Sequence, residues 1–184
     1  MTTAYCSQYR DIEDKIWKDR ACSLCALWMA LKSLKSDFNL SPNELLKKGL
    51  YINAFVDPGY WRHDRLTVLS HNYGLPSYAE EFKSAPFGKE TKYAEEILNH
   101  GINKIFNFLK NGEGVIIVSV PKDFIHFDKP HSILLHSVKE ENNEKYLIYN
   151  DSAKENEEEG KNLKVSLQDF AKSWRRLAIF INKI

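Results

Sequence analysis

The hydrophobic pattern of the chain changes its period at about residue 111. Before that point, apolar residues recur at the three- and four-residue spacing of a buried helix face, most clearly at Leu24, Leu27, Trp28, Leu31 and Leu34. After it, the segment 114–120 (GVIIVSV) is rich in β-branched residues and typical of a buried strand. Helices followed by antiparallel strands predict an α+β fold rather than a doubly wound sheet.

Start and stop signals predict four helices in the first part of the chain. The first spans 21–34, with Asp19 placed to cap it or to interact with its dipole. The second has a capping box, with Ser41 at the cap and Glu44 three residues on, and stops at Gly49. The third spans 64–73 and ends at Gly74, and the fourth spans 92–110 with a potential break near His100-Gly101. Strands are expected at 114–120, 131–138, 145–150 and 177–181, with a short helix at 166–173.

A chain of 184 residues has room for one ordinary domain, and no low-complexity linker divides it. We therefore expect a single domain over 1–184, with a helical half at about 1–110 and a sheet half at about 111–184. The pattern carries no signal for the oligomeric state.

Composition excludes several functional classes. The formal net charge of +1 gives no overall attraction for a polyanion, so no nucleic-acid partner is expected. Apolar runs are too short to span a bilayer, and the first ten residues lack a signal-peptide pattern, so we expect no membrane partner and a cytoplasmic location, or secretion if a leader has been removed. Three cysteines do not describe a disulfide scaffold.

Cofactor and metal motifs are also missing. No glycine loop that could cradle a phosphate precedes a helix, and Cys22 and Cys25 have no second cysteine pair to complete a zinc site. His131 and His136 lie at odd spacing on one expected strand, which points them to opposite faces. We therefore expect no cofactor and no metal.

Cys22, His131 and Asp151 together have the chemistry of a nucleophilic site. Cys22 lies in the first turn of a predicted helix, where the helix dipole favours a thiolate. His131 is expected to open a strand and Asp151 to follow the next strand, so a hairpin between them would bring both to the same end. A carboxylate there can orient an imidazole that activates a thiol. Spacing alone leaves open a buried cysteine, a capping histidine and a turn-forming aspartate.

The order of these residues resembles a known family. The segment 22–29 (CSLCALWM) is similar to the active-site helix of the double-glycine leader peptidases that process bacteriocins, cysteine peptidase family 39, and of their stand-alone relatives. The downstream segments 112–120, 131–135 and 149–152 resemble that family's strands, and 165–174 resembles its closing helix.

The resemblance implies a papain-like fold, in which a helical half carrying Cys22 packs against a sheet half carrying His131 and Asp151. It also implies a glutamine that donates to the oxyanion, and Gln8 fits because 5–8 (YCSQ) resembles the short strand that ends in that glutamine. Two positions depart from the family pattern: Ser23 replaces a glycine, and Ser152 replaces a proline. Neither change removes a reactive group.

We therefore predict a cysteine hydrolase that cleaves a peptide or amide bond of a peptide or protein substrate through an acyl-enzyme. Two alternatives remain: a non-catalytic papain-like module that binds peptides, and an acyltransferase or transglutaminase-like enzyme using the same site. The aromatic segment 51–61 either covers the core, which we favour, or lines a substrate cleft.

Overall fold

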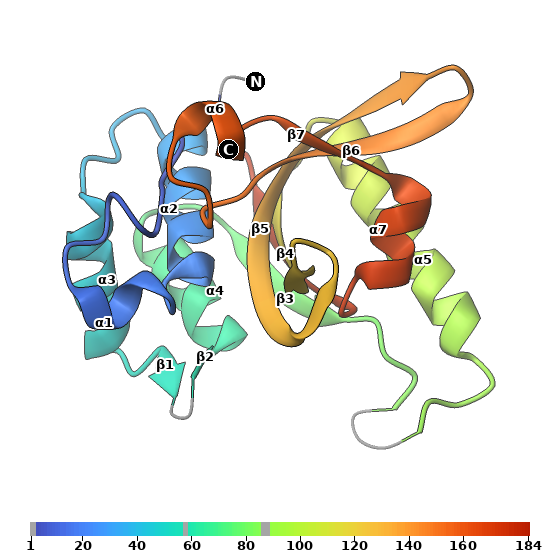
Figure 1. Cartoon of the computed structure of the whole chain (residues 1–184), viewed down its shortest axis with the longest axis horizontal. Coiled ribbons are helices and arrows are strands. Elements are labelled where there is room, and N and C mark those ends of the chain that lie inside the picture. The colour runs from blue at the N-terminus through green and yellow to red at the C-terminus, as the bar shows by residue number, and fades with distance from the viewer. Residues whose placement is uncertain (1–2, 57–58, 86–88) are drawn as a thin grey trace.

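A six-stranded antiparallel sheet organises the molecule. The computed structural model describes residues 3–56, 59–85 and 89–184, and helices cover both faces of the sheet (Figure 1). The strand order is β3-β8-β4-β5-β6-β7. The strands are β3 (Ser77–Glu81), β4 (Gly114–Lys122), β5 (His126–Glu141), β6 (Glu144–Asn150), β7 (Leu163–Ser166) and β8 (Leu177–Asn182).

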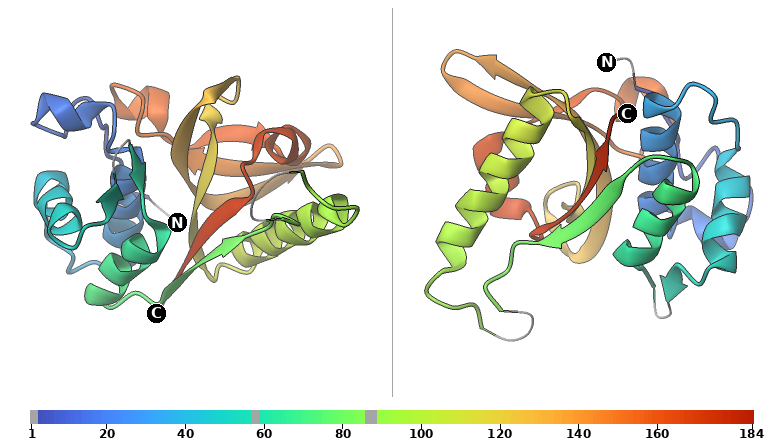
Figure 2. Two further views of the ribbon diagram at one scale, coloured as in Figure 1. Left: turned by 90° about the horizontal axis from the view of Figure 1, so that it is seen from below. Right: turned by 180° about the vertical axis from the view of Figure 1, so that it is seen from behind.

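Alternation along β4 divides the core into two layers. Val115 and Ile117 pack in the cluster formed with α2 (Cys22–Leu34), whereas Ile116 and Val118 pack in the cluster formed with α5 (Ala94–Lys110) and α7 (Leu167–Ser173). Figure 2 shows the same arrangement from two further sides, with the N-terminal helices on one side of the sheet and α5 on the other. Because both faces are covered, β4 is a continuous apolar run rather than a half-polar strand.

The remaining elements surround α2 or connect the strands. These are α1 (Lys15–Lys18), α3 (Pro42–Tyr51), β1 (Phe55–Val56), β2 (Tyr60–Trp61), α4 (His63–Asn72) and α6 (Glu157–Gly160). The capping box predicted for Ser41 and Glu44 is present at the start of α3. Gly49 does not end that helix, however, because α3 continues to Tyr51. A Cβ at Gly49 would lie 3.0 Å from the Trp61 ring, so close packing explains this glycine.

The helical half contains α1, β1 and β2, which were not predicted, and it differs from its prediction at β3 and α5 as well. The strand β3 lies inside the region expected to be helical and forms one edge of the sheet by pairing with β8. The helix α5 is unbroken at Gly101, where a Cβ would approach the rings of Phe82 and Trp174 to 2.7–2.8 Å. Close approach to aromatic side chains, and not a break, therefore requires this glycine.

The strand that carries His131 is longer than predicted. β5 begins at His126, so His131 is an interior residue, paired with Val120, and not the first residue of its strand. The expected hairpin between β5 and β6 is present and closes through Asn142 and Asn143, whose φ values are 51° and 66°. Two consecutive residues with positive φ are typical of the type I′ turn that joins paired strands.

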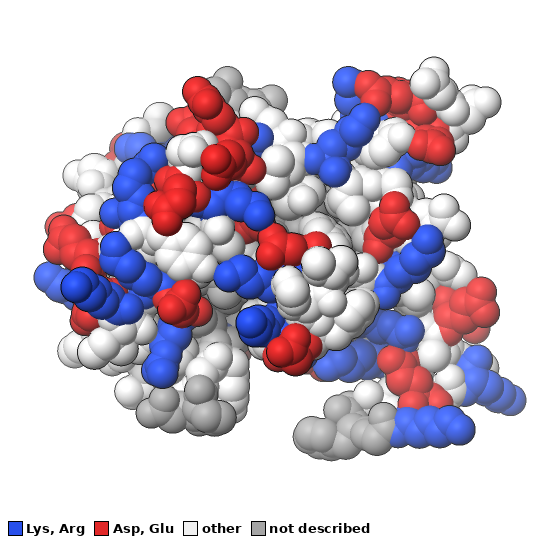
Figure 3. Space-filling view, viewed as in Figure 1, with Lys and Arg blue, Asp and Glu red and all other residues white. Residues whose placement is uncertain are grey.

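Within the described ranges, no helix combines the length and the apolar character needed to cross a lipid bilayer. Lysine and arginine are interspersed with aspartate and glutamate on the face seen in Figure 3. This mixture agrees with the near-zero net charge of the whole sequence.

Candidate active site

Cys22 is the first residue of α2, and its side chain is partly exposed. Ala21 occupies the N-cap position and makes no side-chain capping bond. Of the two roles expected for Asp19, capping this helix is wrong, because Asp19 is the C-cap residue of α1. The first amide groups of α2 therefore remain unsatisfied by a side chain, which leaves their partial positive charge available to stabilise an anion at Cys22.

His131 lies between Cys22 and an acidic residue. Its Nε2 is 2.6 Å from Oδ1 of Asp151, and both side chains are about 95% buried. The thiol of Cys22 is within hydrogen-bonding reach of the same imidazole. Since Nε2 faces Asp151, Nδ1 is the ring nitrogen left to face the sulfur.

The structure distinguishes Asp151 from its neighbour Asn150. The side-chain amide of Asn150 donates to Thr3 Oγ1 at 3.0 Å, and its oxygen accepts from the Asn162 amide at 2.9 Å. Asn150 therefore fixes the N-terminal segment and the β7 connection. The Asp151 carboxylate instead faces His131 and is held by the Ala153 amide at 2.8 Å.

Cys22, His131 and Asp151 shift one another's pKa values through these contacts. Burial opposes ionisation of each member, but the Asp151 and Cys22 contacts outweigh it and raise the pKa of His131 to about 10. Burial would also raise the pKa of Cys22, yet the bond and charge of His131 lower it below the usual thiol range. The pKa of Asp151 is lowered by His131 in the same way, against the effect of its burial. The site thus favours the charged form of all three groups: a thiolate at Cys22, an imidazolium at His131 and a carboxylate at Asp151.

Gln8 lies in an irregular segment, not at the end of the short strand expected at 5–8. It is 3% exposed, its backbone amide donates to Ser152 O at 2.8 Å, and its Oε1 accepts from Ser152 Oγ at 3.1 Å. The side chain is thereby oriented through its oxygen. Among the described residues, Nε2 of Gln8 has no acceptor, so this amide group retains its donors for another ligand.

The two departures from the family pattern both form contacts around the site. Ser152 holds Gln8, as described above. Ser23 Oγ lies 2.7 Å from Ser132 Oγ, a bond that joins the start of α2 to β5 beside His131. The Ser132 backbone also hydrogen-bonds to the Cys22 sulfur and lowers its pKa. Sequence reasoning did not identify Ser132, because only the packing of α2 on β5 brings it to the thiol.

The other cysteines belong to the core. Cys6 and Cys25 are fully buried and adjacent, and burial, reinforced by the contact with Cys6, raises the pKa of Cys25 well above its usual value. His136 is buried at an irregularity of β5 and contacts Ser137. In the part of the chain that the structure describes, no group of three histidine, cysteine or acidic side chains could hold a metal ion.

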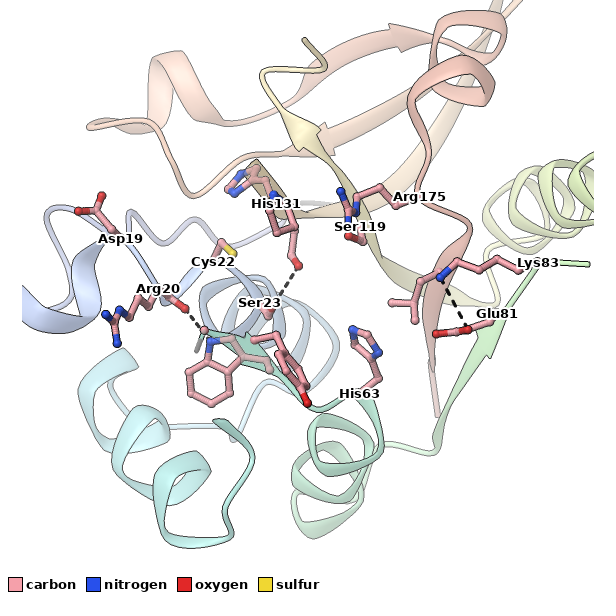
Figure 4. Close-up of a pocket in the computed structure, with 16 residues that line it drawn as sticks. Asp19, Arg20, Cys22, Ser23, His63, Glu81, Lys83, Ser119, His131 and Arg175 are labelled. Atoms are coloured by element: carbon pink, nitrogen blue, oxygen red, sulfur yellow. Dashed lines mark hydrogen bonds and ion pairs between the residues drawn. The ribbon is translucent and has the colours of Figure 1, made fainter. Parts of the chain in front are cut away.

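A cavity of about 510 Å³ lies beside Cys22 and His131 (Figure 4). Residues 59–61 form part of its wall, so the aromatic segment contributes to a cleft as well as to the core: Trp61 is buried, whereas Tyr60 is exposed. Asp57 and Pro58 of that segment lie outside the described residues. The opposite wall comes from the sheet, at Ser119, Ser132 and Leu177.

A sequence model of the Peptidase_C39 like family matches residues 2–178, nearly the whole chain. The chain belongs to this family. It is thus a papain-like cysteine peptidase, and the predicted α+β, papain-like fold is confirmed by solved structures of related architecture.

Two of these structures cover almost the whole chain. The first is a double-glycine-motif protease from an AMS/PCAT transporter in complex with the leader peptide, with 15% identity and a TM-score of 0.59 over 100% of this chain and 93% of that one. The second is the peptidase domain of Streptococcus ComA, a bifunctional ABC transporter of a quorum-sensing pathway, with 16% identity and a TM-score of 0.58 over 96% and 99%. No curated protein sequence gives a significant match to this chain.

Proposed function

We propose that this chain hydrolyses a peptide bond by thiol catalysis at Cys22. The observation that carries the proposal is the contact chain from the Cys22 thiol through His131 to Asp151, with 2.6 Å between the last two. The Cys22 thiolate attacks the carbonyl carbon, and His131 passes its proton from Nδ1 to the leaving amine, which gives a thioester acyl-enzyme. His131 then takes a proton from a water molecule, and the water oxygen attacks the thioester carbon. The C–S bond breaks, the acid leaves, and the Cys22 thiolate and the His131 imidazolium are restored.

Two further groups serve this reaction. Asp151 holds the imidazole in the required orientation and stabilises its cationic form. Nε2 of Gln8 and the backbone amide of Cys22 donate to the oxyanion that forms on the attacked carbonyl. A peptide substrate also agrees with the first structural relative, which was solved with a leader peptide bound.

The test compares wild type with Cys22→Ala. Each is incubated with a mixed peptide library, and the products are read by mass spectrometry. We expect defined cleavage products from wild type and none from Cys22→Ala. Covalent labelling by a peptidyl thiol probe at Cys22, without any cleavage product, would contradict hydrolysis and favour a binding module or an acyl transfer. Addition of a nucleophilic amine separates those two, because only an acyltransferase would form a new amide.

A further inference from the structure

The cavity beside Cys22 contains an arginine that the proposed reaction does not use. Arg175 lies on the sheet side, between α7 and β8, and lines the cavity together with Cys22 and His131. In Figure 4 it extends toward Ser119 and His131, whereas the guanidinium of Arg20 points away from both.

The backbone around Arg175 is fixed. Its amide donates to Ser119 O on β4 at 3.0 Å, and the residues at 174 and 177 are buried in the core. A side chain that projects from such an anchored position reaches the same part of the cavity with little loss of backbone entropy.

Most of the hydrogen-bonding capacity of Arg175 is unused. A guanidinium has five N–H donors, and the one side-chain acceptor for Arg175 among the described residues is Phe127 O at 3.4 Å. Neighbouring cations already face a carboxylate: Lys83, on the cavity wall, lies 3.9 Å from Glu81, and Arg176, outside the cavity, is paired with Glu90. Arg175 has no carboxylate partner within the described part of the chain.

We propose that Arg175 binds a carboxylate of the substrate, so that preferred peptides carry an acidic group within about two residues of the cleaved bond. This inference rests on the proposed peptidase function. A guanidinium forms charge-assisted and often bidentate bonds with a carboxylate, which neither water nor a neutral amide replaces fully. The carboxylate comes from an aspartate or glutamate side chain, or from a free C-terminus just beyond the cleaved bond.

The experiment uses peptides of one parent sequence that the wild-type enzyme cleaves. Each of the three positions on either side of the cleaved bond carries Asp, Glu, Asn or Gln in turn, and a second set ends near the bond as a free acid or as an amide. Because Arg175 is exposed, we expect kcat/KM to be only about tenfold higher for the acidic member at one position, the scale of one charge-assisted contact. The set that responds identifies the source of the carboxylate.

Two variants assign this preference to Arg175. Arg175→Gln should remove the acidic preference while still cleaving the neutral peptides, and Arg175→Glu should reverse it toward lysine at the same position. Arg176→Gln is the matched control, since it removes the same charge one residue away, where the side chain is paired with Glu90 outside the cavity. It should keep the preference.

The outcomes separate the two proposals. Wild-type cleavage without an acidic preference, or a preference that persists in Arg175→Gln, would overturn this inference and leave the peptidase function intact. A wild-type protein that cleaves no peptide in either set or in the library would overturn both.

Discussion

Cys22 and Cys25 are the same residue type on the same helix, one turn apart. Their surroundings shift the pKa values of the two thiols in opposite directions. Cys22 begins α2, is partly exposed and faces His131, and the pKa of its thiol is lowered. Cys25 is fully buried beside Cys6, and the pKa of its thiol is raised. Helix position alone gives a thiol only a modest shift, so the imidazole and the exposure create most of the difference.

The largest expected effect on catalysis at Cys22 comes from Asp151, which contacts His131. Asp151→Ala should lower kcat by on the order of 1000-fold or more, because His131 loses both its orientation and the stabilisation of its cation. Asn150→Ala should retain most of kcat and lower stability instead, since Asn150 fixes the N-terminal segment through Thr3 and Ala4. Steady-state kinetics well below the melting temperature of each variant check this. Loss of turnover in Asn150→Ala, with activity kept in Asp151→Ala, would reverse the assignment.

The next largest effect on kcat is expected from Gln8, the side chain proposed to donate to the oxyanion. Gln8→Ala should lower kcat by about 100- to 1000-fold with little change in KM, as expected for a donor that acts on the transition state. Ser152→Ala keeps the donor and removes the bond that orients it, so its loss should be clearly smaller. An equal loss in both variants would point to a structural role for the contact between the two side chains.

A third test compares the thiols directly. At pH 5.5–6, iodoacetamide should modify Cys22 at least about tenfold faster than Cys6 or Cys25, because only Cys22 combines exposure with a lowered pKa. Peptide mapping of the labelled protein gives the three rates. His131→Ala should keep the exposure but shift the labelling of Cys22 to higher pH, since the thiolate loses its cationic partner. Equal rates for the three cysteines, or a pH profile unchanged by His131→Ala, would contradict this account.

The same contrast explains which parts of the molecule the sequence predicted. The helix with Cys22, the buried strand at 114–120 and the β5–β6 hairpin follow from local periodicity, and they were predicted to within a few residues. The short strand β3 was missed because its place in the sheet depends on pairing with β8, about 100 residues away. Gly49 and Gly101 were misread as a stop and a break, because the side chains that require them come from distant segments.

Some residues of the candidate site were predicted from the sequence, and others were not. Cys22, His131, Asp151 and Gln8 came from motif order and family resemblance, and His131 contacts both Cys22 and Asp151 in the structure. Ser132 and Arg175 carry no local signal. A serine beside a histidine and an arginine after a tryptophan are ordinary sequences. They reach the cleft only because β5 packs on α2 and because β8 lies next to β4.

The smallest expected effect on activity is that of replacing Cys25, the buried cysteine of the pair. Cys25→Ala should leave kcat/KM within about threefold of wild type, because the residue faces the core and not the cleft. The lost sulfur leaves a void in a fully buried layer, so the free energy of unfolding should fall by about 1–2 kcal/mol and the melting temperature by about 3–6 °C.

Cys22→Ala should show the reverse, with no turnover and a melting temperature within about 2 °C of wild type, since a partly exposed side chain leaves little void. Thermal unfolding and kinetics on the same preparations check both variants. A large loss of activity in Cys25→Ala, at a temperature where the protein is fully folded, would mean that the two thiols are coupled and that the first turn of α2 does not act alone.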